Sequence, residues 1–328
     1  MTDTVDSTLP TVETLRTSPA ATPTGAASTA TVSVVVPAHD EARTIEATLE
    51  ALRRSAHREV LDVVVVANGC TDDTAAVARA AGARVVELST PSKAAALRAG
   101  DQAAAGTFPR IYLDADIRLA PGTLDALADV LRTEAAVVSS PRIVFDTASS
   151  SWPVRAFYSA YADLPYVRAG LIGLGVYGLS RAGRARFGEF PDVTADDLFV
   201  QRMFADHERL TSGGEYVVAA PRDLRNLVKV RTRTAAGNAE LSTIEQFGAG
   251  GRTGADAPAE SAVGEHHRET AAAFGRSTGS TSTALLRRVL ARPASIPSFA
   301  VYTAVTIASR VSARRRQSAA WARDTSTR

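Results

Sequence analysis

Short runs of apolar and β-branched residues recur along the first third of the chain, and each run ends abruptly in a polar cluster. The runs are Val32–Val36, Val63–Val66 and Ile111–Leu113. Their length and continuity are typical of strands that are buried on both faces of a parallel sheet. This pattern restricts the chain to an α/β fold if helices connect the strands.

The segments between these runs have helical character. Ile45, Leu49 and Leu52 recur at helical spacing within residues 41–56, which predicts a helix there. The other elements that we expect are helices at 71–81 and 92–105 and strands at 84–88 and 110–114. Alternating strands and helices indicate a mostly parallel sheet with right-handed crossovers and helices on its faces.

The polar clusters follow the ends of the expected strands. They are Pro37–Glu41, Asn68–Thr74 and Asp114–Asp116. Ligands of parallel sheets bind beyond the carboxyl ends of the strands, so we expect the three clusters to meet at one site. Asp114 and Asp116 place two carboxylates one residue apart, and hard oxygen ligands of this kind suit Mn²⁺ or Mg²⁺.

Bulk properties limit the alternatives. The chain has 328 residues and a net charge of +2, which gives no global field for nucleic acid. Cys70 is the single cysteine, so an internal disulfide is excluded and a reducing, cytoplasmic location is expected. Residues 1–30 lack the basic start and apolar core of a signal peptide, and we expect a disordered arm there.

The C-terminal part differs in composition from the rest. Residues 248–283 are rich in Gly, Ser, Thr and Ala and predict a flexible linker, and a helical segment at 284–328 follows. Within it, Ala294–Ser309 is apolar but shorter than the about 20 residues that span a bilayer. Arg310 and Arg314–Arg316 come next. The segment is either a helix docked on the main domain or a helix in the membrane interface with its arginines on anionic lipids.

Taken in order, the motifs of Val32–Leu241 resemble those of family 2 glycosyltransferases with the GT-A fold. Pro37–Glu41 resembles the segment that cups the nucleotide base, Asn68–Thr74 an acid-rich segment, and Ser92–Gly100 the helix that follows. Asn68 stands where the family has an acid. The residues that the resemblance assigns to the nucleotide donor are Pro37, His39, Glu41, Asn68, Asp72, Lys93, Asp114 and Ala115.

Later motifs resemble the acceptor side of the same family. Gly175 and Tyr177 lie in a segment similar to the strand that lines the acceptor. The segment that begins at Arg231 resembles one that contacts the diphosphate through Arg231 and Arg233, although Thr234 replaces its tryptophan. Trp152 begins an aromatic segment that either stacks on the acceptor or forms the core face of a helix over residues 152–164.

Asp196 and Asp197 resemble the motif that supplies the catalytic base. The alternative for them is a pair of acids that merely satisfies a helix N-terminus. Spacing to Arg202 favours Asp196 as the base, and both acids stay candidates. The resemblance divides the chain into a GT-A domain at 31–247, with a nucleotide-binding half at 31–117 and an acceptor-binding half at 118–247.

The resemblance implies an inverting, metal-dependent enzyme. It would move a sugar from a nucleotide-diphosphate sugar to a hydroxyl of a saccharide or lipid-linked acceptor, a precursor of the cell envelope, at the inner face of the membrane. A nucleotidyltransferase is the first alternative, but no Gly-rich basic loop follows Val32–Val36. An oxidoreductase lacks its G-x-G-x-x-G motif there. A non-catalytic binding module would be favoured by loss of the acids, and all are present.

Overall fold

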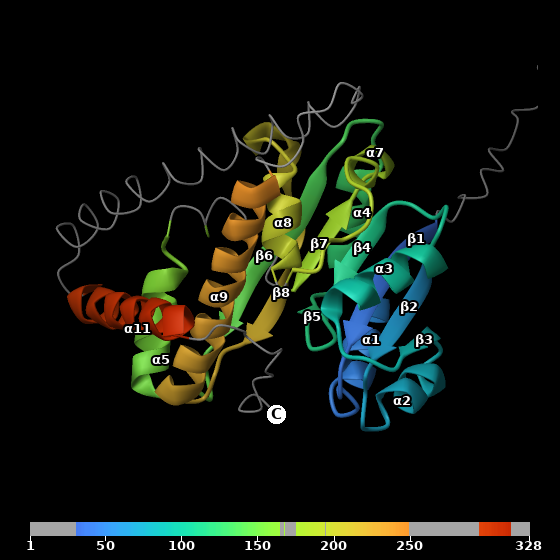
Figure 1. Ribbon diagram of the computed structural model, residues 1–328. Coiled ribbons are helices and arrows are strands. Elements are labelled where there is room, and N and C mark those ends of the chain that lie inside the picture. Colours follow the sequence, from blue (N-terminus) through green and yellow to red (C-terminus); the bar gives the residue numbers. More distant parts are fainter. Residues whose placement is uncertain (1–30, 165–166, 168–174, 194, 249–294, 316–328) are drawn as a thin grey trace, which may run out of the picture.

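The computed structural model describes residues 31–164, 167, 175–193, 195–248 and 295–315 (Figure 1). The predicted arm at 1–30 lies outside the described residues, and so does the predicted linker apart from its first residue, Gly248. The expected helical segment at 284–328 is described only from Ser295 to Arg315.

One mixed sheet of eight strands, in the order β3-β2-β1-β4-β7-β6-β8-β5, organises the described chain. The strands are β1 (Thr31–Ala38), β2 (Val60–Asn68), β3 (Arg84–Leu88), β4 (Arg110–Leu113), β5 (Arg118–Leu119), β6 (Val138–Asp146), β7 (Val176–Leu179) and β8 (Arg209–Ala219). β3, β2, β1 and β4 are parallel, as predicted, whereas β7 runs antiparallel to both β4 and β6. The parallel half therefore carries the predicted clusters, and β7 brings a later segment beside β4.

Helices cover both faces of this sheet. They are α1 (Ile45–Arg54), α2 (Thr74–Ala80), α3 (Lys93–Ala103), α4 (Thr123–Leu131), α5 (Trp152–Tyr161), α7 (Arg181–Arg184), α8 (Asp196–Arg202), α9 (Leu224–Gly248) and α11 (Ile296–Arg315). A short 3₁₀ helix, η1 (Asp206–Glu208), precedes β8. The helices predicted at 41–56, 71–81 and 92–105 are confirmed as α1, α2 and α3, each shorter than expected.

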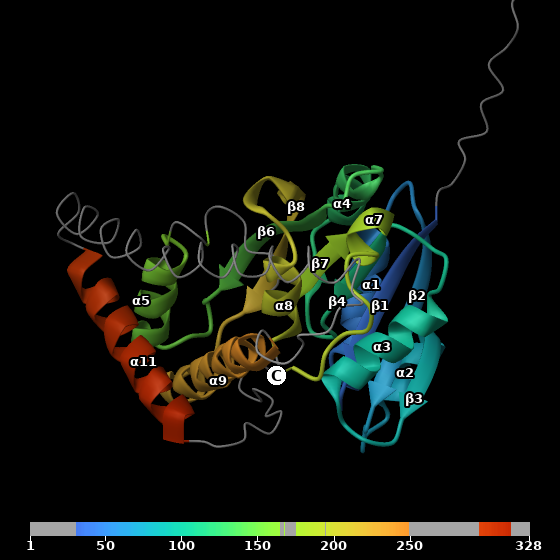
Figure 2. The same ribbon diagram turned by 45° about the horizontal axis from the view of Figure 1, so that its top comes forward.

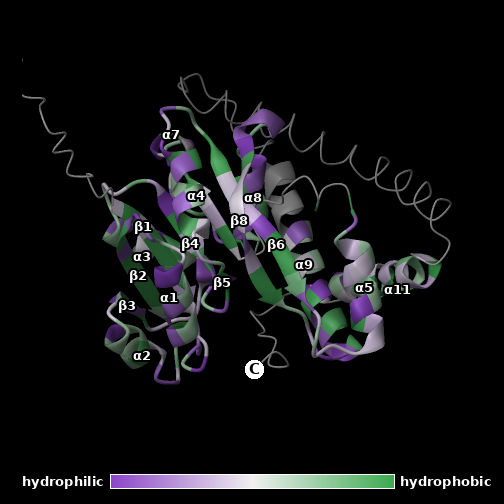
Figure 3. Ribbon diagram, turned by 180° about the vertical axis from the view of Figure 1, so that it is seen from behind, coloured by the Kyte–Doolittle hydropathy of each residue, from purple (hydrophilic) through white to green (hydrophobic). Residues whose placement is uncertain are grey.

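The pleat of β1 divides the core into two layers. Val34 and Val36 pack in one apolar cluster with residues of α1, α2 and α4, whereas Val35 packs in another with residues of α3 and α8. Figure 3 shows that β1 and β2 are largely hydrophobic. Strands with both faces covered read as continuous apolar runs, which explains the pattern from which the fold was predicted.

A third apolar cluster lies at the other end of the sheet. There α11 contacts both α5 and α9 (Figure 2). The rings of Phe157 and Tyr302 lie 5.4 Å apart. These contacts show that α11 docks on the main domain, as one of the two predictions for the C-terminal segment held, while membrane association of the helix stays a prediction. Among the described helices, none combines the length and apolar character needed to cross a bilayer.

Candidate active site

The first two polar clusters interlock at the carboxyl ends of β1 and β2. The backbone N–H of Glu41 donates to Thr74 Oγ1 at 2.6 Å, and that of Ala42 donates to Asp72 Oδ2 at 3.1 Å. Glu41 is buried, and its Oε2 accepts from the hydroxyl of Thr44 at 2.6 Å. Glu41 and Asp72 therefore shape the two loops, and their assignment to the donor site stays a prediction.

Asn68 links the end of β2 to the start of α3. Its side chain is fully buried, and Oδ1 accepts from the backbone N–H of Ser92 at 2.8 Å. Ser92 in turn caps α3, because its hydroxyl accepts from the N–H of Ala95 at 3.2 Å. This chain of contacts fixes Lys93 as the first residue of the helix. The Nδ2 amide of Asn68 is buried with no hydrogen-bond partner in the described part of the chain.

Glycine allows α3 to approach the sheet closely. A Cβ atom on Gly100 would lie 2.2 Å from Cγ1 of Val35 in β1. Since real Cβ atoms do not approach other carbons so closely, a larger residue would push α3 outward. The position of Lys93 over the strand ends thus depends on a glycine two turns further along the helix.

Lys93 stands between the two groups of acids. Its Nζ lies 3.0 Å from Asp114 Oδ1 and 2.9 Å from Asp196 Oδ1. The other oxygen of Asp196 accepts from the hydroxyl of Tyr177 at 3.2 Å. Asp114 follows β4, Tyr177 lies in β7 and Asp196 begins α8. The amine therefore contacts acids from two separate elements, and β7 joins the cluster through Asp196. Residues from the segments predicted for the donor and acceptor halves are brought together here.

Backbone contacts hold the Asp114–Asp116 segment in place. The N–H of Asp114 donates to the carbonyl of Gly175 at 2.7 Å, and the hydroxyl of Thr48 donates to the carbonyl of Ala115 at 2.7 Å. Gly175 has a φ of +110°, and a Cβ there would meet Ile117 at 2.6 Å. Ala115 is buried, while Asp116 is exposed and Asp114 partly exposed. One carboxylate thus faces solvent and the other faces Lys93.

Burial and charge act in opposite directions on this cluster. Burial raises the pKa of Asp196, and the ammonium group of Lys93 opposes that shift. Burial alone would lower the pKa of Lys93, but the carboxylates of Asp114 and Asp196 hold it well above its ordinary value. Burial, together with the charge of Asp196, also raises the pKa of Tyr177. Lys93 therefore stays charged, and Tyr177 stays a hydrogen-bond donor.

Asp197 has a different environment from Asp196. Asp197 is half-buried, and its Oδ1 accepts from the N–H of Leu198 at 2.7 Å. Asp196 is 4% exposed, and both of its oxygens contact partners within the cluster. The two acids of the motif therefore differ in access, a distinction that their adjacent positions in the sequence did not reveal.

A buried network that the sequence analysis missed contacts this cluster through the stacked rings of Tyr112 and Tyr177. Asp101 of α3 accepts from Arg110 at 2.7 Å, from the hydroxyl of Tyr112 at 2.6 Å and from Arg184 at 2.9 Å. Tyr112 stacks on Tyr177 with ring centroids 5.0 Å apart. The sequence carried one signal for this network. Arg110 begins the apolar run at 110–113, and a buried guanidinium requires an acid as its partner.

Other predicted residues lie on α5 and α9, the helices that contribute to the third apolar cluster. The guanidinium of Arg231 lies over the ring of Tyr161 at 4.9 Å and over that of Phe157 at 5.7 Å. Phe157 and Tyr161 are buried, so the expected core face of α5 is observed. Trp152 is 57% exposed at the start of α5. The roles assigned to Arg231, Arg233 and Trp152 stay predictions.

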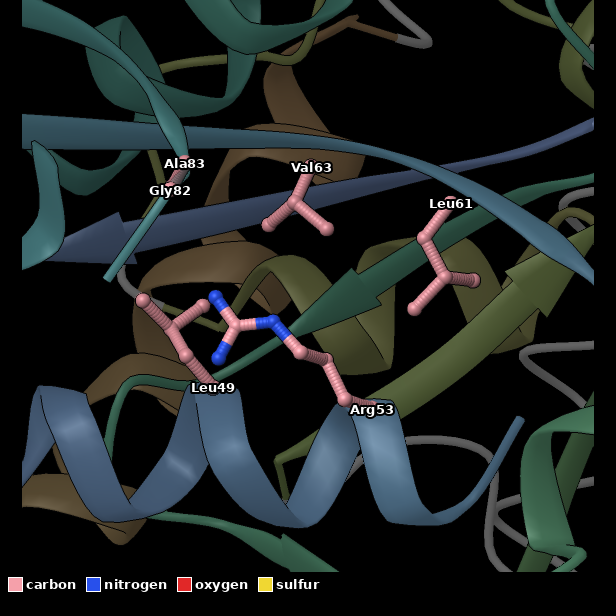
Figure 4. A pocket seen from close by; sticks show the side chains of 6 residues that line it. All are labelled: Leu49, Arg53, Leu61, Val63, Gly82 and Ala83. Atoms are coloured by element: carbon pink, nitrogen blue, oxygen red, sulfur yellow. The ribbon is translucent and has the colours of Figure 1, made fainter. Parts of the chain in front are cut away.

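A small cavity lies away from these residues. Its volume is about 100 Å³, and it is enclosed between α1 and β2 (Figure 4). The lining residues are Leu49, Arg53, Leu61, Val63, Gly82 and Ala83. None of them belongs to the polar clusters, so this cavity is separate from the candidate site.

Comparisons with known proteins agree with this architecture. Residues 33–187 match the family model described as glycosyl transferase family 2. A mannosyltransferase from Pyrobaculum calidifontis, solved with GDP-Man and Mn²⁺, is similar in structure with a TM-score of 0.56 and 22% identity, over 88% of each chain. Glucosyl-3-phosphoglycerate synthase from Mycobacterium tuberculosis, solved with Mn²⁺, UDP and its product, has a TM-score of 0.48 and 21% identity, over 65% of this chain and 79% of that one. A search of curated proteins found no match.

Proposed function

Residues 33–187 form a family 2 glycosyltransferase domain, and from this premise we propose that the protein moves a sugar from a nucleotide-diphosphate donor to an acceptor hydroxyl with inversion. The observation that carries the proposal is the position of Lys93 between Asp114 and Asp196. Such a transfer needs positive charge at the leaving diphosphate and a base at the acceptor. Lys93 joins Asp114, which is proposed for the first task, to Asp196, the neighbour of the residue that is proposed for the second.

Asp114 and Asp116 fit a divalent cation of the hard, oxygen-binding class. Among the described residues, no His, Cys, Asp or Glu forms with this pair a group of three whose ligand atoms all lie within 4.8 Å of one another, so oxygens of the donor and water would complete the coordination. When bound, Mn²⁺ or Mg²⁺ neutralises the diphosphate as a Lewis acid. Lys93 adds its own charge there, and its contact with Asp114 holds that carboxylate at the end of β4.

The nucleotide would lie over the ends of β1 and β2. Pro37 lies near the end of β1 and His39 directly follows the strand. The buried Nδ2 amide of Asn68 is a donor suited to a carbonyl or ring-nitrogen acceptor of the base. An acid at that position would instead accept a hydrogen bond. Asn68, which stands where the family has an acid, therefore suits a base that presents a hydrogen-bond acceptor at this point, whereas an acid would suit a base that presents a donor.

We assign the role of base to Asp197 and a positioning role to Asp196. A base must reach the acceptor hydroxyl, and Asp197 is the more accessible of the two. The buried Asp196 contacts Lys93 and Tyr177, and so fixes the amine and the acceptor-side strand β7 relative to each other. Gly175 and Tyr177 would line the acceptor beside it.

Kinetics of two matched variants test this assignment. With a panel of GDP- and UDP-sugars, Mn²⁺ and mass spectrometry of the products to identify the donor, Asp197→Asn should lower turnover by about 10²–10⁴-fold and still bind donor. Asp196→Asn should weaken donor binding as well, because Lys93 loses a partner. Equal, small losses in both variants would mean that the pair only caps α8. Donor binding without turnover in the unaltered protein would indicate a binding module.

The acceptor that we propose is lipid-linked, reached at an anionic membrane surface. α11 packs one side on α5 and α9 and turns the other outward. The exposed residues of the outward side include Ile296, Ala300, Ala304, Ile307 and Val311. Arg310 and Arg314 are also exposed, and α11 contains no acid. Apolar contact flanked by arginines suits an interfacial helix on anionic lipid.

Point substitutions on the outward side test this without disturbing the docked side. Ile307→Asp should reduce binding to anionic liposomes, and the binding of the unaltered protein should weaken as salt rises. Val60→Asp, at an exposed apolar residue of β2, is the matched control and should bind as before. Liposome binding that is absent in the unaltered protein, or equal in both variants, would rule out this role of α11.

A further inference from the structure

His39, Asp40 and Cys70 form a cluster beside the proposed nucleotide site. One ligand atom from each residue lies within 4.8 Å of the other two, and all three residues are partly buried. The cluster joins the loop after β1 to the loop after β2. Among the described residues, no other group of three His, Cys, Asp or Glu side chains comes so close together.

We propose that these three side chains bind a zinc-class cation, at a site distinct from Asp114 and Asp116. Imidazole, thiolate and carboxylate are the ligands that Zn²⁺ prefers, whereas Mn²⁺ and Mg²⁺ prefer oxygen alone. Three protein ligands leave a fourth position for water or for an atom of a bound ligand. The binding itself does not depend on the proposed function; only its effect on the sugar donor does.

The hydrogen bond of His39 prepares the ring for a metal. Nδ1 lies 2.8 Å from the carbonyl oxygen of Asn68. A carbonyl only accepts, so in this contact Nδ1 carries the proton, and in the neutral ring Nε2 carries the lone pair. A backbone carbonyl on the far nitrogen is the usual way in which proteins orient a metal-binding histidine. Nε2 lies 3.8 Å from Asp40 Oδ2.

The backbone brings Asp40 and Cys70 to the same place. Asp40 has a φ of +48°, in the left-handed region, and its N–H points to Cys70 Sγ at 3.4 Å. Asp40 Oδ1 accepts from the N–H of Thr71 at 2.5 Å, which orients the carboxylate. Bonds of about 2.0–2.3 Å to zinc place tetrahedral ligand atoms roughly 3.5 Å apart. Atoms that lie within 4.8 Å of one another therefore need to approach by at most about 1.3 Å.

Occupation of this site would compete with the donor. His39 and Asn68 are proposed to contact the nucleotide, and a cation on Nε2 would hold the His39 ring away from the base. We therefore expect added Zn²⁺ to weaken donor binding in the presence of excess Mn²⁺.

Cobalt titration of the full chain gives a direct readout. Co²⁺ bound to a thiolate absorbs in the near ultraviolet, and Cys70 is the only cysteine, so the band reports on this site alone. We expect the band in the unaltered protein, its displacement by Zn²⁺, and its loss in Cys70→Ser. His39→Ala should weaken Zn²⁺ binding by at least about 10-fold, because even outer partners of metal ligands contribute 10- to 100-fold.

Two controls separate this site from others. His57→Ala removes a histidine whose side chain is 63% exposed, outside the cluster, and should leave the band intact. Asp116→Ala should also keep it while losing Mn²⁺-dependent donor binding, so failure of the proposed function would not remove the band. Absence of a thiolate band in the unaltered, folded protein, or Zn²⁺ affinity unchanged by both Cys70→Ser and His39→Ala, would overturn the proposal.

Discussion

Removal of the Lys93 amine should show how much the ion pairs of Lys93 with Asp114 and Asp196 contribute to the free energy of unfolding. Lys93→Met keeps the length of the side chain and deletes its charge, which leaves the buried Asp196 without its cation. Removing one partner of a buried pair costs about 3–5 kcal/mol. The side chains of Lys93 and Asp114 are 24% and 37% exposed, so solvent screens part of this loss. We expect a decrease of about 3 kcal/mol in the free energy of unfolding at pH 7.

The pH dependence identifies the cause of that loss. Burial raises the folded-state pKa of Asp196, and Lys93 opposes the shift, so the pKa should rise further in Lys93→Met. The folded variant then takes up a proton at a pH where the unfolded chain does not. Its stability relative to the unaltered protein should therefore recover as the pH falls from 7 toward 5, by at most about 1.4 kcal/mol per pH unit.

Urea unfolding followed by circular dichroism, with a chelator present, measures these differences. The double variant Lys93→Met/Asp196→Asn removes the charge that Lys93→Met strands, so it should be more stable than Lys93→Met by about 1.5 kcal/mol or more. A loss below about 0.5 kcal/mol in Lys93→Met would refute the reasoning. So would losses that simply add in the double variant.

Three further outcomes follow from the described contacts. Asp116→Ala should abolish Mn²⁺-dependent donor binding in calorimetry, and unchanged donor binding would contradict the metal assignment. The melting temperature should stay unchanged or rise, because clustered carboxylates repel each other. Gly100→Ala should lower the free energy of unfolding by about 1–3 kcal/mol, and Val35→Ala in the same chain should restore part of it; a neutral Gly100→Ala would contradict the close approach of α3 to β1. Asp101→Asn should cost about 3–5 kcal/mol, because Arg110 and Arg184 lose their shared carboxylate; a loss near that of a surface change would contradict the network.

The parallel half of the fold was predictable because its signals are local. Strands buried on both faces read as continuous apolar runs, and their polar ends mark the edge where ligands bind. β7 was found only through family resemblance. The short run Val176–Leu179 carries no alternation, and nothing in it shows that it pairs antiparallel to β4. Pairing between distant segments depends on the whole sheet, which local pattern does not encode.

The candidate site divides in the same way. Residue types at a strand end indicated Asp114, and family resemblance indicated the pair at 196–197, but the separate environments of these acids arise from contacts between distant elements. Lys93 illustrates the difference. A lysine at a helix start is unfavourable to the helix dipole, and the sequence signals for Lys93 were this local conflict and the family resemblance of Ser92–Gly100. The structure resolves the conflict with two acids from other elements, at 3.0 and 2.9 Å. A residue that is locally unfavourable and globally satisfied is where a functional site is expected, because selection for stability alone would not retain it.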